Sequence, residues 1–370
     1  MKYKIHIIGG ALMLSSLSGY AQEITDTTVV NVAYGVQSSK TQSAAISTVK
    51  GERLMEITSP TVGNSLKGML PGLSILQKSG EPGYDFYMEN MFTRGVSSFN
   101  SKQQMLVFVD GFEAPLDNIS AEEIESVSLL KDAAALAIYG SRGANGVLLI
   151  TTKKGYHSSP KIGFRMQTGI QMPTIMDTPM DAYNYARLYN QALENDGKAA
   201  LYTNEALAAY QSGSNQYLYP NVNWKNQLYK NTTPLTMSEL SFRGGGGGLN
   251  YYVMAGLMHN DGIYRGTDSK QRENANVNYA RYNFRANLDV DITKYFRTFL
   301  YSGVSFAEKT TPGAGGADDY LKSVWTTPPN AFPVYNPNGS FGGTSLYTNP
   351  VANLLNRGLY KENSRSLQVI

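Results

Sequence analysis

The sequence predicts an α+β domain followed by the first five to six antiparallel strands of a transmembrane β-barrel. Three observations support this fold class. Residues 105–155 combine short strand, turn and helix patterns in one compact segment. Arg281–Ile292 alternates polar and apolar residues at every position, and the connections between such strands are long and short in turn. Short turns at one end of the strands and long loops at the other are typical of outer-membrane barrels.

The first 21 residues have the organisation of a secretory signal peptide. Met1–Lys4 carries two lysines, Ile5–Leu17 is apolar, and Ala21 is a small residue at the end of the segment. The alternative is a membrane anchor, but the apolar stretch is shorter than the ~20 residues that a spanning helix needs. We therefore expect residues 1–21 to be removed on export, and we expect no helical span elsewhere.

The composition fits an exported, β-rich chain. It contains no cysteine, so disulfides cannot hold the fold. It has 36 glycines and 26 tyrosines but only 16% charged residues, a balance that favours strands joined by many turns. The 32 Lys and Arg residues nearly equal the 29 Asp and Glu residues in number, which argues against nucleic-acid binding.

Residues 22–47 are expected to be a flexible segment that contains one β-prone stretch, Thr27–Ala33. The polar, small residues of Gln37–Ser47 follow this stretch, and such a composition favours mobility. Two interpretations of Thr27–Ala33 remain open from its residues. It is either an ordinary first strand of the next domain or an extended peptide that pairs with a partner protein.

The α+β domain is expected over residues 48–155. Met105–Val109 is an apolar strand that ends at Asp110-Gly111, a pair suited to the positive φ angles of a tight turn. Ser120 and Glu123 have the spacing of a capping box, which predicts the start of a short helix. This half of the domain therefore begins with a hairpin and a helical turn.

The second half of the domain contains a capped helix between two strands. Val127–Leu130 is the first of these strands, and Val147–Thr152 is the second. Asp132 can cap the alanine-rich turn Ala133–Tyr139. Gly140 is expected to end that turn as a left-handed residue.

Residues 156–370 are expected to form the opening part of a barrel. The predicted strands are Lys161–Gln171, Leu235–Arg243, Leu249–Met258, Arg281–Ile292, Phe296–Phe306 and an incomplete Ser364–Ile370, with a helix over Asp181–Asn195. Gly244–Gly248 is interpreted as a tight turn rather than a low-complexity linker. A soluble antiparallel sheet would show the same alternation along each strand, so the loop lengths favour the membrane assignment.

No cofactor, metal or catalytic site is predicted. Gly140–Gly146 is glycine-rich, but it follows a helix and precedes a strand, the wrong order for a phosphate-binding loop. His157 and His259 lie far apart and lack other ligands at metal-binding spacing. Asp289 and Asp291 share one face of a strand, where lumen-facing polar residues explain them better than a catalytic pair. The sequence therefore does not indicate an enzyme.

Residues 124–155, IESVSLLKDAAALAIYGSRGANGVLLITTKKG, resemble the plug-domain signature of SusC/RagA-type TonB-dependent outer-membrane transporters. The similarity extends upstream through Ser65–Ile75 and Arg94–Ser97. The resemblance implies that the signature residues are Arg94, Gly95, Asp110, Gly111, Lys131, Asp132, Tyr139, Gly140, Gly143 and Gly146. Phe92-Thr93 departs from the family, where an apolar residue and an arginine are more usual. The small β-sandwich that often precedes the plug is also missing.

The resemblance implies an active importer in the cell outer membrane. Its TonB box would be Thr27, Thr28, Val29, Val30, Asn31, Val32 and Ala33. The implied partners are TonB with ExbB and ExbD, a SusD-like lipoprotein, outer-membrane lipid, and an oligosaccharide or peptide as cargo. Complete barrels of this kind have about 22 strands, so the chain is interpreted as an N-terminal fragment that should not transport alone. The alternative is a surface-displayed binding protein or adhesin without transport.

Overall fold

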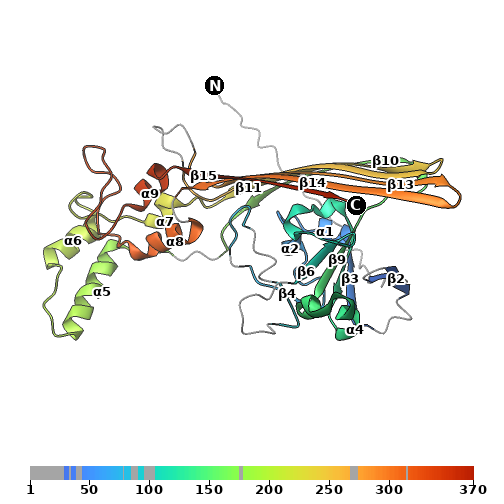
Figure 1. Cartoon of the computed structure of the whole chain (residues 1–370). Coiled ribbons are helices and arrows are strands. Elements are labelled where there is room, and N and C mark those ends of the chain that lie inside the picture. Colours follow the sequence, from blue (N-terminus) through green and yellow to red (C-terminus); the bar gives the residue numbers. More distant parts are fainter. Residues whose placement is uncertain are drawn as a thin grey trace, which may run out of the picture.

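The structure, a computed structural model, describes residues 29–32, 35–38, 44–77, 79–84, 91–95, 105–174, 178–266, 274–313 and 316–370. The predicted signal peptide lies outside these residues. An α+β domain rests against one face of a long six-stranded sheet, and a group of helices lies beyond one end of that sheet (Figure 1). The predicted fold class is confirmed for both units.

The α+β domain is built around a five-stranded sheet of order β3-β8-β9-β6-β7, in which only β6 and β9 are parallel. Its strands are β3 (Ile46–Lys50), β6 (Leu106–Val109), β7 (Phe112–Glu113), β8 (Ile124–Leu130) and β9 (Val147–Thr152), with the pair β4 (Leu73–Ile75) and β5 (Met91–Thr93) beside it. Its helical segments are α1 (Gly51–Met55), α2 (Val62–Ser65), η1 (Leu116–Asn118), η2 (Ala121–Glu123), α4 (Ala133–Leu136) and η3 (Ala137–Asn145).

Both faces of this sheet are covered, which explains why β6 and the first four residues of β9 are continuously apolar. In β9, Leu148 and Ile150 point into the larger core, which also contains Leu54 of α1. Val147 and Leu149 point to the opposite face, where Leu136 of α4 packs against them. Successive side chains of a strand alternate between faces, so a strand buried on both sides needs a continuous apolar run.

The predicted turns of the domain are confirmed, with two corrections. Asp110 and Gly111 have φ angles of 50° and 90° and join β6 to β7 as expected. The Ser120 capping box is present, but the helix it begins is a single 3-10 turn. Gly140 does have a positive φ, yet its ψ of −149° is not left-handed helical. The helix instead ends at Leu136, and the chain continues through a kinked 3-10 segment, because Gly140 changes its direction without stopping it.

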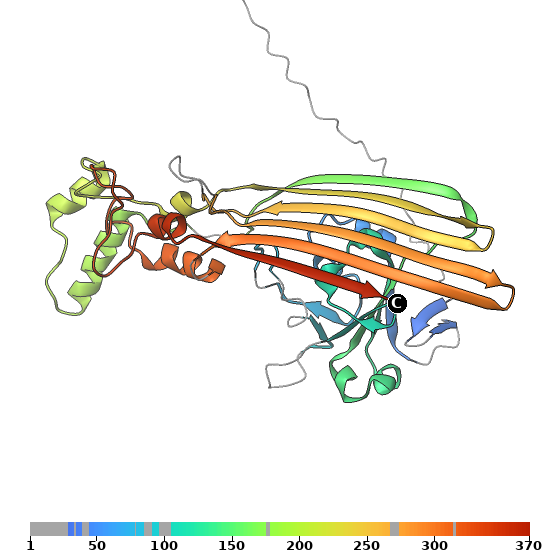
Figure 2. The ribbon, with the colours of Figure 1, turned by 45° about the horizontal axis from the view of Figure 1, so that its top comes forward.

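The long sheet has its six strands in sequence order, and every pair is antiparallel (Figure 2). Its strands are β10 (Ser158–Gln171), β11 (Thr233–Gly246), β12 (Leu249–Asp261), β13 (Asn278–Thr293), β14 (Phe296–Pro312) and β15 (Leu359–Val369). Most extend beyond the predicted bounds, because the alternation fades at strand ends before the backbone pairing does. The first three residues of Gly244–Gly248 continue β11, and only Gly247 and Gly248, with φ angles of 61° and 89°, make the turn.

The face of the sheet that points away from the α+β domain is apolar and exposed. On β10, Ile162, Phe164 and Ile170 are each at least 70% exposed. These residues lie at even-numbered positions of the strand and therefore share one face. An exposed apolar face of this size on several adjacent strands is the surface that a barrel presents to lipid. Among the described residues, no helix is both long and apolar enough to cross a membrane.

The long connections between strands fold together into one outer cap. Its helices are α5 (Ala182–Asn195), α6 (Asn204–Ser212), α7 (Trp224–Leu228), α8 (Gly316–Thr326) and α9 (Pro350–Asn356). A shared core joins Trp224 from the first connection, Tyr264 from the second, and Phe332 and Leu354 from the third. The predicted helix after Asp181 is confirmed as α5, with the Asp181 side chain accepting a hydrogen bond from the Asn184 amide.

Candidate functional site

The polar face of β13 points at the α+β domain and is buried there. Its members, which alternate with exposed apolar residues, are Arg281, Asn283, Arg285 and Asn287. Asn287 is fully buried, whereas Phe284 on the opposite face is 47% exposed. The sequence predicted this polarity, but not that the polar side would be covered by the preceding domain.

Glu123 is the centre of this interface. Its carboxylate accepts a hydrogen bond from Arg285 Nε at 2.5 Å and one from Asn283 Nδ2 at 3.0 Å. It also accepts one from the backbone amide of Ser120 at 2.9 Å, which completes the capping box. A buried carboxylate is tolerated only when it is paired and hydrogen-bonded, and here the domain and the sheet together supply the partners.

A second set of contacts runs through Asp110 at the end of β6. The carboxylate of Asp110 accepts hydrogen bonds from the amide and the hydroxyl of Thr152, at 2.9 and 2.5 Å. The Asn287 side-chain amide then donates to the Thr152 hydroxyl at 2.7 Å and to the Lys153 carbonyl at 2.8 Å. Arg285 Nη1 lies 3.8 Å from Asp110, so one guanidinium faces both carboxylates.

Each of the six long strands makes at least one polar contact with the α+β domain. These contacts, besides those of β13, include Arg165 of β10 to the Met55 carbonyl, Glu239 of β11 to Ser120, Tyr252 of β12 to the Glu122 carbonyl, Lys309 of β14 to the Gly83 carbonyl, and Gln368 of β15 to the Val109 carbonyl. The interface is therefore held by hydrogen bonds and ion pairs, in contrast with the apolar core inside the domain.

Most of the predicted signature residues stabilise turns of the domain rather than this interface. Arg94 and Gly95 have φ angles of 59° and 95°, and the Arg94 amide donates to the Gly72 carbonyl. Lys131 Nζ donates to the Pro71 carbonyl at 2.8 Å. Tyr139 packs on Phe108 with ring centroids 5.1 Å apart.

Three further signature residues fix the start of β3 and the start of β9. Asp132 caps α4 and accepts a hydrogen bond from the Ala45 amide at 2.6 Å. This backbone contact, followed by that with Ala135, holds the pKa of Asp132 below its usual value. Gly143 and Gly146 lie in tight surroundings, and a Cβ on Gly146 would stand 2.1 Å from Thr93 Oγ1. Of the signature, the structure places only Asp110 directly at the buried interface.

The sequence did not identify Glu239, Arg165 and Lys309 as interface residues, and it predicted only a capping role for Glu123. The sequence does show charged and amide side chains at regular spacing along the strands. This spacing predicts a polar face, but it does not predict that the α+β domain packs against that face. Among the described residues, no three His, Cys, Asp or Glu side chains are grouped to hold a metal. Of Thr27–Ala33, only Val29–Val32 is described; it forms β1 and pairs with β2 (Gly35–Ser38).

The comparisons with known proteins agree with this architecture. The family model for the TonB-dependent Receptor Plug Domain matches residues 38–147. TonB-dependent receptor P26 of Formosa agariphila is 28% identical over 88% of this chain and 31% of its own length. TonB-dependent receptor SusC of Bacteroides thetaiotaomicron is 27% identical over 74% of this chain and 26% of its own length.

A solved structure of the RagAB peptide importer in its closed-closed state matches at 25% identity with a TM-score of 0.61. That match covers 83% of this chain and 35% of the solved chain. The chain thus spans roughly a third or less of the length of these relatives, none of which is described as an enzyme. The chain is similar to the SusC/RagA-like TonB-dependent receptors: residues 38–147 match the TonB-dependent receptor plug domain, and this plug is seated on six antiparallel strands of a barrel wall that is not closed.

Proposed function

We propose that the complete protein is an outer-membrane importer that takes up a bulky nutrient and is driven by TonB. The observation that carries this proposal is the plug's attachment to all six wall strands by polar contacts on the side opposite the lipid-facing residues. A wide barrel needs a plug domain that closes the lumen at rest and moves when cargo passes.

The polar contacts between the plug and the wall suit a plug that can move. Hydrogen bonds between plug and wall can be exchanged for hydrogen bonds to water, so their net contribution is about 0.5–1.5 kcal/mol each. An apolar interface of the same extent would expose its area to water at a much larger cost. The pairing of Glu123 with Arg285 nevertheless defines one resting position, because either charge alone would be left buried and unpaired.

The proposal divides the chain as signal peptide (1–21), TonB-box region (22–47), plug (48–155) and barrel wall (156–370). Thr27–Ala33 would bind TonB by strand addition, and the extended backbone of β1 supports this role. TonB with ExbB and ExbD would supply the energy. A SusD-like lipoprotein would cover the outer mouth, and the cargo would be an oligosaccharide or a peptide.

The test is deletion of Thr27–Ala33 in cells that express the complete protein. Cargo binding should stay within a few-fold of the wild type while uptake is lost, because strand addition transmits energy and does not contact the cargo. Deletion of Ser39–Ser43, which leaves both β1 and β2 in the chain, is the control and should preserve uptake. Uptake that persists without Thr27–Ala33 would refute the TonB-box assignment. A wild type that binds its ligand but never imports it would identify an adhesin.

A further inference from the structure

A groove lies on the lipid-facing side of the long sheet, across strands β13, β14 and β15, which are neighbours at one edge of the sheet (Figure 2). Its volume is about 290 Å³, close to the ~300 Å³ of the smallest ligand pockets. The side chains that line it are Tyr282, Phe284, Phe306, Glu308, Asn363 and Arg365. Each of the three aromatic rings is at least 37% exposed, so the groove is open to the surroundings of the sheet.

The groove lies where the apolar part of this side of the sheet ends. On β14, Phe306 is followed on the same side by Glu308, and on β15 Leu367 is followed by Arg365 in the direction of the outer cap. Aromatic side chains at the edge of an apolar band mark the membrane interface of outer-membrane barrels. The groove is therefore placed at the level of lipid headgroups, on the side of the outer cap.

Glu308 and Arg365 are the two charged side chains of the groove. Neither of them makes a hydrogen bond or an ion pair with another described residue. In the strand register Glu308 is opposite Asn363 and Arg365 is opposite Phe306, so the two charges are diagonal neighbours. Diagonal neighbours start ~7–8 Å apart at the backbone, and these two do not close that distance to an ion pair. The groove thus presents a negative and a positive group with space between them.

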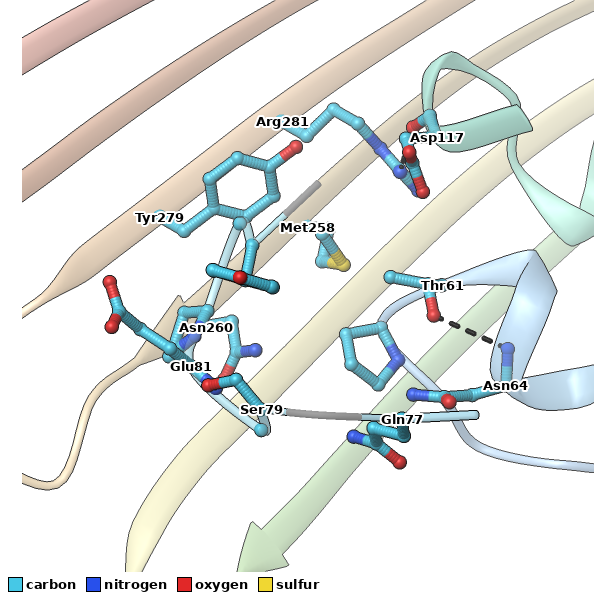
Figure 3. A pocket seen from close by; sticks show the side chains of 15 residues that line it. Thr61, Asn64, Gln77, Ser79, Glu81, Asp117, Met258, Asn260, Tyr279 and Arg281 are labelled. Atoms are coloured by element: carbon cyan, nitrogen blue, oxygen red, sulfur yellow. Dashed lines mark hydrogen bonds between the residues drawn. The ribbon is translucent and has the colours of Figure 1, made fainter. Parts of the chain in front are cut away.

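Charged side chains on the opposite side of the same strands do have partners. Lys309, which follows Glu308 in the sequence, pairs with Glu81 of the plug at 3.4 Å. Arg281 of β13 points toward Asp117 of the plug, whose carbonyl accepts a hydrogen bond from Arg281 Nη1 at 2.6 Å (Figure 3). Among the described residues, the groove charges on the lipid-facing side have no such partner, and membrane lipid is the neighbour on that side.

A ligand that satisfies both groove charges carries a negative acceptor and a positive donor close together. A phosphate suits Arg365, because its oxygens accept two parallel hydrogen bonds from a guanidinium. A primary ammonium suits Glu308, because it offers N–H donors to a carboxylate. An acidic lipid without an amine would leave Glu308 facing a second negative charge. A choline headgroup carries a positive charge but has no N–H to donate.

We propose that this groove binds a membrane lipid with a phosphoethanolamine headgroup. The phosphate would contact Arg365, the ammonium group would contact Glu308, and an acyl chain would lie along Phe284 and Phe306. This inference goes beyond import: it requires that the sheet be part of a membrane wall, but it does not depend on TonB or on the cargo. The lipid would bridge β14 and β15, the two strands that carry the third connection of the outer cap.

The test measures lipid binding to the complete, purified protein by native mass spectrometry. The probes are phosphatidylethanolamine, phosphatidylglycerol and phosphatidylcholine with identical acyl chains. The wild type should bind phosphatidylethanolamine best, and Arg365→Gln should weaken that binding by at least ~10-fold, as expected for the loss of a hydrogen bond to a charged group. Glu308→Gln should abolish the preference over phosphatidylglycerol, because the variant neither pairs with the ammonium group nor repels the acidic lipid.

Arg357→Gln and Glu362→Gln are the matched controls. Both residues are exposed and lie outside the groove, Arg357 at the end of α9 and Glu362 on the lumen side of β15. They should leave the lipid preference unchanged, and heat-modifiable migration on gels checks that each variant retains a folded barrel.

Three results would overturn the proposal. They are a wild type that binds the three lipids equally or prefers phosphatidylglycerol, a Glu308→Gln variant that keeps the wild-type preference, and control variants with the same effect as the groove variants. None of these measurements involves uptake. A negative result therefore leaves the importer assignment and its test on Thr27–Ala33 untouched.

Discussion

At Gly146, the absence of a Cβ atom allows the plug to pack closely. Its φ is 96°, and a Cβ there would lie 2.1 Å from Thr93 Oγ1 and 3.5 Å from the Leu130 carbonyl. Gly140 also has a positive φ, but a Cβ there would meet nothing within 4 Å. Gly146→Ala should therefore destabilise the plug by clearly more than the ~1–3 kcal/mol of backbone strain expected for Gly140→Ala.

The measurement is thermal unfolding of both variants, together with the sensitivity of cells to large antibiotics that the outer membrane normally excludes. Gly140→Ala serves as the control for positive φ without a clash. Equal effects of the two substitutions would show that the contact with Thr93 relaxes at no cost, and that the start of β9 is looser than described.

Asp132 gives the plug a pH dependence of known sign. Backbone amides lower its folded-state pKa, so its stabilising contribution is complete above the unfolded pKa of about 4. That contribution is lost as the pH falls through the lower, folded-state pKa. Asp132→Ala should cost ~0.5–2 kcal/mol near pH 7, as for other helix caps. The difference in Tm between variant and wild type should become smaller near pH 2, where the carboxyl is protonated, and a difference that does not change with pH would contradict this role.

At the level of the element, β13 shows what sequence can predict and what it cannot. The alternation in Arg281–Ile292 identified the strand, its two faces and their polarity, because side chains on a strand alternate with a period of two. It could not predict that Asn287 would be completely buried, since that depends on a domain more than a hundred residues earlier in the chain. Glu123 shows the same limit. Its capping role depends on neighbouring residues and could be predicted, whereas its pairing with Arg285 depends on a residue far away in the sequence and could not.

The two faces of β13 should respond differently to the same charge. Leu288→Arg on the lipid side should cost ~2–4 kcal/mol near the bilayer midplane and reduce insertion into the membrane. Asn287→Arg should allow insertion but disturb the plug, because the larger side chain displaces the hydrogen bonds to Thr152 and Lys153. Heat-modifiable migration on gels reports insertion, and antibiotic sensitivity reports plug seating. Identical behaviour of the two variants would rule out a two-sided membrane strand.

At the scale of the whole molecule, one buried core in the outer cap joins residues from all three long connections. Trp224 is 1% exposed, donates to the Pro328 carbonyl at 3.2 Å and packs edge-on against Phe332. Trp224→Ala should cost ~3–5 kcal/mol and loosen all three connections together. Limited proteolysis should then cut both the 172–232 and the 313–358 segments faster. Trp325, which is 47% exposed, provides the control: Trp325→Ala should leave cleavage unchanged.

The order of strands in the plug also sets its mechanical behaviour. β3 is the edge strand of order β3-β8-β9-β6-β7, and it is the first of these strands after the N-terminus. Within this sheet, tension applied at the N-terminus therefore reaches the short ladder between Ile46–Lys50 and β8 before it reaches any other strand of the sheet. Tension across the sheet peels this ladder one pair at a time from Ile46, whereas tension along the strand must shear all of its pairs together. The force at which the plug begins to unfold is thus set by the short ladder between β3 and β8. The strands β8 and β9, which are anchored to the wall through Glu123 and Thr152, can stay in place.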